Sequence, residues 1–144
     1  MNFTPSHPEF ASVVQASFER QGLMKTLGAT LDRIEPGRID ISVRYRDSLS
    51  QQHRFLHAAV TTAIADTACG YAALSLMPAG SEVLTVEFKV NLLRPAAGTC
   101  FVAEGRVVKP GKTITVSRAD VLAYTDGVPV LIATLLATMI TLAG

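Results

Sequence analysis

The chain has 144 residues, a length at which a single domain buries roughly 70% of the surface that its unfolded form exposes. Hydrophobic residues make up 49% of the chain and charged residues only 17%, which favours a packed core and excludes a disordered, solvating chain. The formal net charge is +1, with 13 basic and 12 acidic side chains spread along the sequence, which excludes the concentrated basic surface of a nucleic-acid-binding protein.

Residues 1–27 predict a helical segment. Ser6 is placed to act as an N-cap, and Glu9, three residues later, would complete a capping box. Apolar residues then follow at helical spacing, and Gly22 or Gly28 would end the segment.

The N-terminal ten residues and the two cysteines bear on the compartment. Residues 1–10 contain two prolines and a glutamate where a secretory signal peptide needs a basic start and an apolar run. Cys69 and Cys100 lack the paired spacing of metal-binding or redox motifs, and unpaired thiols suit a reducing environment. We therefore expect a cytoplasmic protein in which both cysteines are small core residues.

A turn at residues 35–37, Glu-Pro-Gly, separates two segments that predict a β-hairpin. The first segment covers residues 30–34 and the second covers residues 38–45. The second segment alternates between polar side chains and an apolar face made of Ile39, Ile41, Val43 and Tyr45.

Residues 58–77 form a stretch of mostly small and apolar side chains in which the single charge is Asp66. A helix that is apolar all round is expected to be buried. The length also suits a membrane-spanning helix, but Ala and Thr are commoner here than Leu, and a carboxylate near the bilayer centre costs at least ~2.5 kcal/mol. The sequence therefore predicts a buried central helix and no membrane association.

The remainder of the chain predicts four long strands. The first, residues 83–93, alternates between two faces, with Leu84, Val86, Phe88, Val90 and Leu92 on one and Thr85, Glu87, Lys89 and Asn91 on the other. Residues 101–108, residues 113–124 and the apolar run 128–142 follow, separated by Pro-Gly and Asp-Gly turns. Helix, hairpin, buried helix and a four-stranded antiparallel meander, in that order, are typical of an α+β fold.

Residues 51–68 read Gln-Gln-His-Arg-Phe-Leu-His-Ala-Ala-Val-Thr-Thr-Ala-Ile-Ala-Asp-Thr-Ala. This stretch resembles the signature of PaaI-type hotdog thioesterases, in which an Asn precedes a His-Gly-Gly that opens the central helix, and an Asp follows nine residues after the His. His57 and Asp66 match that spacing. Residues 84–96 also resemble the strand that follows the helix in this family, and the whole resemblance runs from about residue 28 to residue 142.

The resemblance implies a hotdog fold, in which a long antiparallel sheet wraps around a buried central helix, here about residues 58–77. It places a single domain at residues 28–144, after the N-terminal helical segment. The activity that it implies is hydrolysis of acyl-CoA thioesters to the free acid and CoA.

Asp66 is unusual on physical grounds alone. A lone carboxylate in an apolar helix needs a raised pKa, a partner or a cleft, because burial disfavours its charged form. A purely structural Asp66 would hydrogen-bond a nearby hydroxyl such as that of Thr62 or Thr67. In the family, the corresponding acid either attacks the thioester carbonyl or activates water, and the resemblance carries both alternatives to Asp66.

The resemblance also implies roles for residues around the acid. The backbone N–H of Ala58, in the first helical turn, would polarise the thioester oxygen. Gln51 stands where the family has an Asn that positions water or the carbonyl, and Thr85 where relatives carry a hydroxyl that contacts the acid. His57 and Ala59 complete the helix start beside the substrate, and His57 is expected to make a structural hydrogen bond there.

Helix geometry separates two groups that the reaction needs. Eight residues at ~1.5 Å each place Asp66 about 12 Å along the axis from the Ala58 amide. One helix cannot bring both groups to a single carbonyl, so a site that uses both must join two chains, most simply across a two-fold axis. We therefore expect a homodimer with two identical sites, while the pairing of dimers into tetramers is left open.

The chain departs from the family pattern at three places. His-Ala-Ala replaces His-Gly-Gly, Gln51 replaces Asn, and Arg54 stands where relatives often have Gly. A first helical turn tolerates Ala, so the Ala58 amide is kept, while the added methyl group would narrow the pocket and change which acyl groups fit.

Basic groups on two loops are candidates for binding the phosphates of coenzyme A. Arg94 lies on one loop, and Gly111 and Lys112 lie on the turn at residues 109–113. The alternative is that they are ordinary solvated residues, as most lysines on hairpin turns are. The three histidines form no recognisable ligand set, so we expect no metal, and no cofactor apart from the CoA of the substrate.

Two other activities are compatible with the motif. A hotdog hydratase or dehydratase would use His57 together with an acid to move protons at carbon. A non-catalytic acyl-CoA sensor would keep the pocket without turnover, although a pure binder gains nothing from a desolvated carboxylate such as Asp66. The expected partners are an acyl-CoA and a second copy of the chain, and the acyl group is left open.

Overall fold

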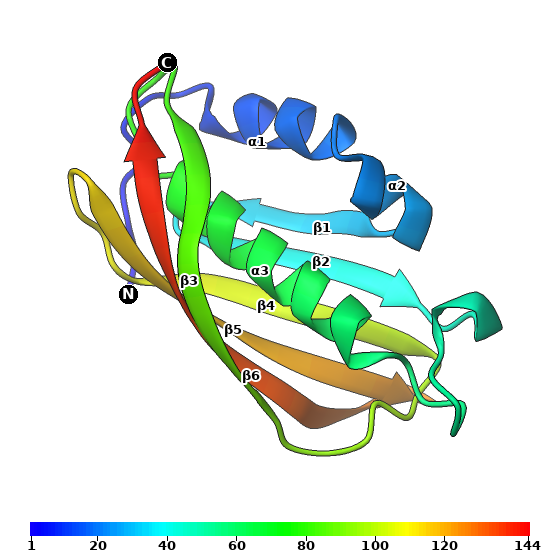
Figure 1. Ribbon diagram of the computed structural model, residues 1–144. Helices are drawn as coiled ribbons and strands as arrows, with labels where there is room; N and C mark the ends of the chain where they lie inside the picture. The colour runs from blue at the N-terminus through cyan, green and yellow to red at the C-terminus, as the bar shows by residue number, and fades with distance from the viewer.

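The computed structural model describes residues 1–144 as one six-stranded antiparallel sheet that curves around a central helix, with two further helices beside it (Figure 1). The helices are α1 (Phe10–Glu19), α2 (Gly22–Leu27) and α3 (Ala58–Leu74), and a 3₁₀ turn, η1 (Asp47–Leu49), precedes α3. The strands are β1 (Thr30–Glu35), β2 (Arg38–Arg44), β3 (Glu82–Leu92), β4 (Cys100–Lys109), β5 (Ile114–Thr125) and β6 (Val128–Leu142). None of the helices combines the length and the hydropathy that a membrane crossing requires.

The strand order in the sheet is β1-β2-β4-β5-β6-β3. The predicted hairpin of β1 and β2 is confirmed, and so is the strand formed by the apolar run at the end of the chain. The predicted four-stranded meander is wrong, because β3 pairs with β6 and not with β4. The reason is that α3 crosses the sheet and delivers β3 to the far edge, after which residues 93–99 carry the chain back to β4, beside β2 (Figure 1).

The alternation predicted for β3 is interrupted by a bulge. The pairing with β6 shifts between Thr85 and Glu87, so that Thr85 lies opposite Met139 and Phe88 lies opposite Ala137. Met139 and Ala137 both point into the core, so Thr85 and Phe88 face the same side of the sheet. The prediction that they face opposite sides is wrong, since the extra residue reverses the alternation beyond it.

Helix α3 is buried along most of its length, as its composition predicts. Small side chains let it approach the sheet closely: a Cβ added at Gly105 of β4 would lie 2.5 Å from the backbone carbonyl carbon of Ala68. The helix ends at Leu74, three residues before the predicted end, although Met77 is still buried.

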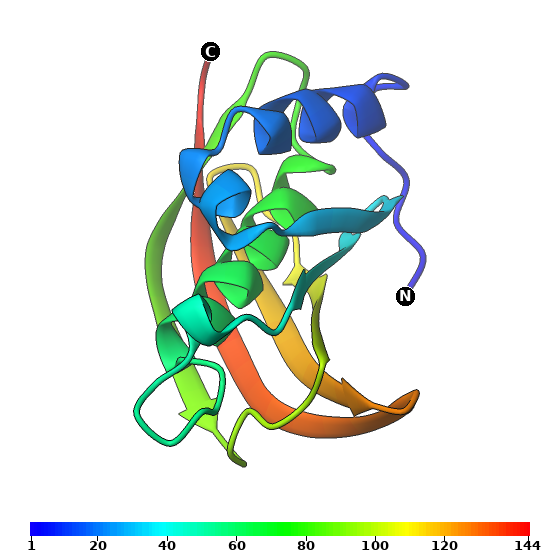
Figure 2. The same ribbon diagram turned by 90° about the vertical axis from the view of Figure 1, so that its right-hand side faces the viewer.

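The N-terminal helices belong to the same core as the sheet (Figure 2). Helix α2 ends at Gly28, which adopts a left-handed conformation with a φ of 66°. Helices α1 and α2 together contribute four buried side chains to the core: Val14, Phe18, Met24 and Leu27.

The capping role predicted for Ser6 is wrong. Helix α1 begins after Glu9, and no side chain caps its start. The Ser6 hydroxyl instead donates a hydrogen bond to the carbonyl of Leu76 across 2.6 Å. Carbonyls near the end of a helix lack partners within the helix, so a tertiary contact has taken the place of the local one.

Candidate active site

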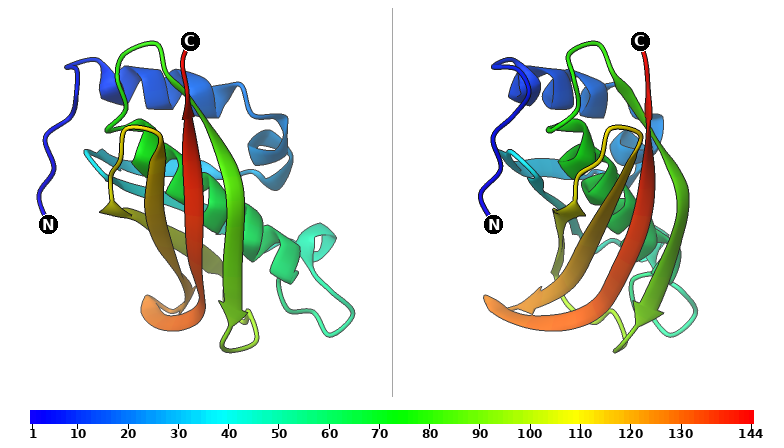
Figure 3. Two further views of the ribbon diagram at one scale, coloured as in Figure 1. Left: turned by 60° about the vertical axis from the view of Figure 1, so that its left-hand side comes forward. Right: turned by 90° about the vertical axis from the view of Figure 1, so that its left-hand side faces the viewer.

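The lone charge of α3 has a hydroxyl partner on the edge strand β3, which runs beside the helix (Figure 3). The Oγ1 of Thr85 donates a hydrogen bond to the Oδ1 of Asp66 across 2.8 Å. Asp66 is half-buried, and this burial raises the pKa of its carboxyl group, while the bond from Thr85 acts in the opposite direction. Neither Thr62 nor Thr67 bonds to the carboxylate, so the local partners considered from the sequence are not used.

A pocket of about 240 Å³ surrounds Asp66. Helix α3 and strand β3 form two of its walls, and Gln21 and Leu23 at the start of α2 form the third. Gln21 is fixed in place because its Nε2 donates a hydrogen bond to the hydroxyl of Tyr71 across 2.9 Å. Gln21 and Tyr71 were not predicted from the sequence, since no local pattern links positions 50 residues apart.

A thiol lies close to Asp66 in the sequence but is unsuited to catalysis. Cys69 is fully buried, and this burial raises the pKa of its thiol, with the charge of Asp66 adding to the effect. A thiolate nucleophile is therefore disfavoured, and the thiol does not line the pocket in which Asp66 lies. No group of three metal-binding side chains lies close enough to hold a metal ion.

His57 is the N-cap of α3. Its Nδ1 accepts a hydrogen bond from the amide of Ala59 across 2.9 Å, which is a structural bond of the kind expected for this residue. An accepting Nδ1 carries no proton, so the proton of a neutral His57 lies on Nε2. The amide of Ala58, by contrast, makes no hydrogen bond in the chain.

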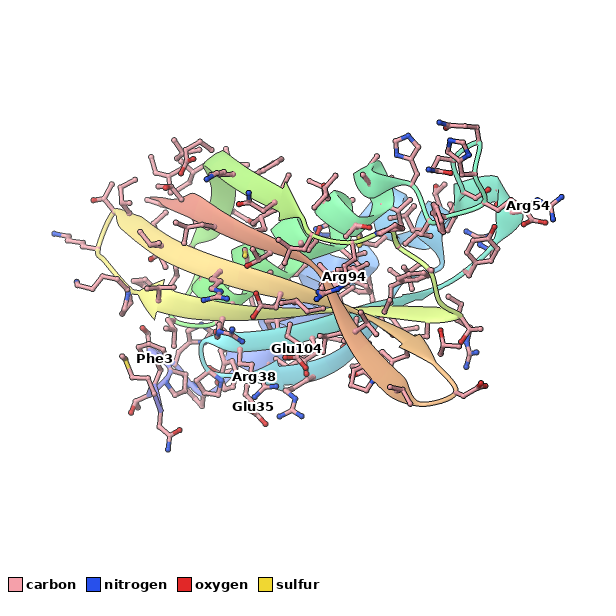
Figure 4. The ribbon with its side chains drawn as sticks, turned by 90° about the horizontal axis from the view of Figure 1, so that it is seen from below. Phe3, Glu35, Arg38, Arg54, Arg94 and Glu104 are labelled. Carbon is pink, nitrogen blue, oxygen red and sulfur yellow. The ribbon has the colours of Figure 1, made fainter.

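The loop before α3 is held together by Gln51. Its Oε1 accepts hydrogen bonds from the amides of His53 and Phe55, which leaves the side-chain NH₂ group free. Within this loop Arg54 has a φ of 63°, in the left-handed region that favours glycine. A glycine would adopt this conformation at a lower cost than Arg54 does. Arg54 lies at one extremity of the molecule (Figure 4).

A second pocket, of about 450 Å³, brings together three of the predicted site residues, Gln51, Ala58 and Arg94. Most of its other lining is apolar and comes from the loop before α3, the end of β3 and the loop that follows it. It shares no lining residue with the pocket around Asp66. On one chain, the proposed oxyanion donor and the proposed acid therefore lie in separate pockets.

The basic residues considered for CoA binding lie far apart on a single chain. The Nη1 of Arg94 donates to the carbonyl of Leu131 across 2.7 Å, beside the second pocket (Figure 4). Gly111 and Lys112 lie on the turn between β4 and β5, where the amide of Gly111 donates to the hydroxyl of Thr115. The sheet register places this turn at the end where β3 begins, whereas Arg94 follows the end of β3.

Comparison with known proteins gives a consistent result. The sequence profile of the Thioesterase superfamily matches residues 53–130. A candidate esterase of Halobacterium salinarum is 27% identical over 121 residues, which cover 81% of this chain and 80% of that protein. A thioesterase family protein from Silicibacter pomeroyi, whose crystal structure is known, has 50% sequence identity to this chain. The two structures superpose with a TM-score of 0.92 over 94% of this chain and 99% of that one.

More distant structures share the fold. The PaaI protein of E. coli, from the phenylacetic acid degradation operon, is 19% identical, with a TM-score of 0.82 over 98% of both chains. A thioesterase from Haemophilus influenzae is 20% identical, with a TM-score of 0.79 over 99% of this chain and 93% of that one. These matches confirm the predicted hotdog fold and the resemblance to PaaI.

Proposed function

The chain belongs to the Thioesterase superfamily, and from this premise we propose that it hydrolyses acyl-CoA thioesters with Asp66 as the catalytic carboxylate. The observation that carries the proposal is the half-buried Asp66, which opens into a pocket and is oriented by the hydroxyl of Thr85. A carboxylate whose burial raises its pKa is a stronger base and nucleophile than a solvated one.

Two routes are open to this carboxylate. It can attack the thioester carbonyl carbon, so that the C–S bond breaks, CoA leaves as the thiolate and an acyl anhydride with Asp66 is later hydrolysed. Alternatively it takes a proton from a water molecule, which attacks the same carbon and yields the free acid and CoA directly. In both routes the hydrogen bond from Thr85 to Oδ1 orients the carboxylate.

The backbone amide of Ala58, which makes no hydrogen bond, is suited to stabilise the negative charge that develops on the thioester oxygen. It lies in the first turn of α3, where a free N–H and the helix dipole both favour negative charge. A thioester oxygen that gains charge during attack would accept a hydrogen bond from it. The free NH₂ group of Gln51 lines the same pocket and is available to position water or the carbonyl.

The separation of Ala58 from Asp66 supports a site shared between two copies of the chain. Eight residues of helix hold them about 12 Å apart along the axis, and each lines its own pocket. A homodimer with antiparallel α3 helices would place the acid of one subunit beside the amide of the other. The unpaired edge of β3, with Leu84, Val86 and Phe88 exposed, is a suitable surface for this contact.

A shared site also suits the basic residues proposed to bind CoA. Arg94 has one N–H engaged with Leu131 and others free, and it borders the pocket of the Ala58 amide. The turn with Gly111 and Lys112 lies toward the end of the sheet nearer the start of β3. Two antiparallel subunits would bring these opposite ends together, with His57 and Ala59 near the mouth of the site.

Release of free thiol from a panel of short, medium, long and aromatic acyl-CoAs tests the proposed function. We expect turnover by the wild type and a loss of at least about 10²-fold in Asp66→Ala, the size of effect typical for a catalytic base. Asp32→Ala, which removes an exposed acid on β1, is the matched control and should retain turnover.

Absence of thiol release from every acyl-CoA by the folded wild type would overturn the proposal and favour an acyl-CoA sensor. Full activity in Asp66→Ala would remove the catalytic role of the carboxylate. The hydratase alternative is disfavoured by the engagement of His57 Nδ1 with the Ala59 amide, which leaves that nitrogen unable to accept a proton from substrate.

A further inference from the structure

Thr61 lies one helical turn after Ala58 and is only 2% exposed. Its hydroxyl group has no hydrogen-bond partner in the protein. Buried hydroxyl groups are nearly always bonded, and a helical threonine can donate to a backbone carbonyl one turn earlier. The absence of this bond leaves a donor and an acceptor unused inside the protein.

The pocket of about 450 Å³ described above is lined by Thr61. Its walls are mainly apolar, with Phe55, Leu92 and Ile132 among them. The other polar side chains, Gln51 and Arg94, keep free N–H groups, but Gln51 is only half-buried and Arg94 is exposed, so water can reach them. Thr61 is thus the buried polar group of this pocket whose hydrogen-bonding capacity is free.

The position of Thr61 relates it to the thioester carbonyl. Ala58 and Thr61 are three residues apart on α3, so they lie on neighbouring parts of the helix surface, separated by about 4.5 Å along the axis. A carbonyl oxygen bound to the Ala58 amide would place the first few carbons of an acyl chain within reach of the Thr61 hydroxyl. An oxygen atom on one of those carbons would form the hydrogen bond that the Thr61 hydroxyl lacks.

On the basis of the proposed function, we propose that Thr61 determines acyl specificity by hydrogen bonding to a hydroxyl or keto oxygen near the thioester end of the acyl chain. The substrates would then be oxygen-substituted acyl-CoAs, in preference to their unsubstituted counterparts. A plain alkyl chain in this pocket leaves the Thr61 hydroxyl unpaired, which disfavours its binding.

The test compares matched pairs of substrates, butanoyl-CoA with 3-hydroxybutanoyl-CoA and with 3-oxobutanoyl-CoA. Thiol release should give a higher kcat/KM for an oxygen-substituted member with the wild type, by about 3- to 10-fold, as expected for one net hydrogen bond. Thr61→Val keeps the shape and removes the hydroxyl, so this preference should disappear. Thr61→Ser keeps the hydroxyl and should retain the preference.

Thr141→Val is the matched control. The Thr141 hydroxyl is also buried and without a partner. It lies near the end of β6, whereas Ile132, which lines the pocket, lies near its start, and Thr141 lines neither of the two pockets. Both Val variants should unfold at a temperature at least as high as that of the wild type, because each removes an unpaired buried hydroxyl. Only Thr61→Val should change the ratio of kcat/KM values.

Three results would overturn the inference. One is a wild type that prefers butanoyl-CoA or treats the three substrates alike, and another is an unchanged preference in Thr61→Val. The third is a lower melting temperature for Thr61→Val, since it would mean that the hydroxyl has a partner inside the protein. Titration calorimetry with non-hydrolysable thioether analogues measures the same preference as a ratio of Kd values, so a failure of turnover would refute the proposed function alone.

Discussion

Asp66 occupies a position in which folding disfavours its charge. Because the pKa of Asp66 is raised in the folded protein, the folded state holds the proton more tightly than the unfolded chain does. The stability contributed by the protonated group is therefore complete below the ordinary pKa of 3.8 and is lost as the pH rises through the folded value. The ionised carboxylate therefore works against stability, which is the cost expected of the catalytic acid proposed here.

Replacement of Asp66 by Asn removes the unfavourable charge and keeps the size of the side chain. We expect Asp66→Asn to be inactive and to have a higher Tm than the wild type at pH 7, with the difference closing as the pH falls through the raised pKa of Asp66 toward 3.8. Thermal unfolding of both proteins over a pH series checks this. A lower Tm for the variant at pH 7 would show that the ionised carboxylate stabilises the fold.

Thr85 affects the pKa of the Asp66 carboxyl group. Its hydrogen bond to the carboxylate lowers the pKa of Asp66, in opposition to the larger effect of burial. In Thr85→Val we therefore expect the acidic limb of the kcat/KM profile to move to higher pH, so that activity is lost first at low pH. Thr85→Ser, which keeps the hydroxyl, should follow the wild type, and identical profiles for all three proteins would contradict the assignment.

At the scale of residues, the sequence predicted the site residues whose chemistry is unusual in their local sequence or that the family resemblance supplies. Asp66 stood out because it is the only charge in an apolar helix, and the resemblance supplied Thr85 as its partner. Gln21 and Thr61 were missed, since an ordinary Gln or Thr becomes notable only when its surroundings are known. Ser6 was misassigned because its partner, Leu76, is 70 residues away.

At the scale of elements, the loop before α3 contains a measurable strain. Arg54 has a φ of 63°, a conformation that costs a residue with a side chain about 1–2 kcal/mol and costs glycine little. We expect Arg54→Gly to raise the free energy of unfolding by up to about 1 kcal/mol, after allowing for the greater entropy of glycine in the unfolded chain. Urea denaturation measures the change.

Gln52→Gly is the control for this prediction. Gln52 neighbours Arg54 but does not have a positive φ, so glycine there brings the entropy cost without relief of strain. This variant should be less stable than the wild type. If both glycine variants were destabilised equally, the left-handed conformation of Arg54 would not be costing stability.

Element boundaries were predictable because they follow local patterns. The turn at residues 35–37 and the change from alternating to continuous apolar residues defined the hairpin and α3 to within a few residues. The partner of β3 was not predictable, since pairing with β6 depends on how far α3 carries the chain across the sheet. The bulge between Thr85 and Glu87 also escaped prediction, because one extra residue leaves no mark in an alternating sequence.

At the scale of the whole molecule, the groups assigned to the proposed reaction centre lie in two separate pockets of one chain. The pocket of Asp66 holds an acid, and the pocket of Ala58 holds a free amide and an apolar cavity. Strand β3 borders both, since its beginning lines one pocket and its end lines the other, and its outer edge is unpaired. A second copy of the chain bound at this edge would complete both centres at once.

The central claim, a site built from two subunits, is tested most directly by mixing two inactive variants. Asp66→Ala and Gln51→Ala each damage a different half, so a mixed dimer has one site with both defects and one site with neither. After unfolding and refolding of an equimolar mixture, we expect thiol release to recover to about one quarter of the wild-type rate, because half of the dimers carry one intact site. Activity no greater than the average of the two variants, with mixed dimers present, would contradict a shared site and place the whole reaction within one chain.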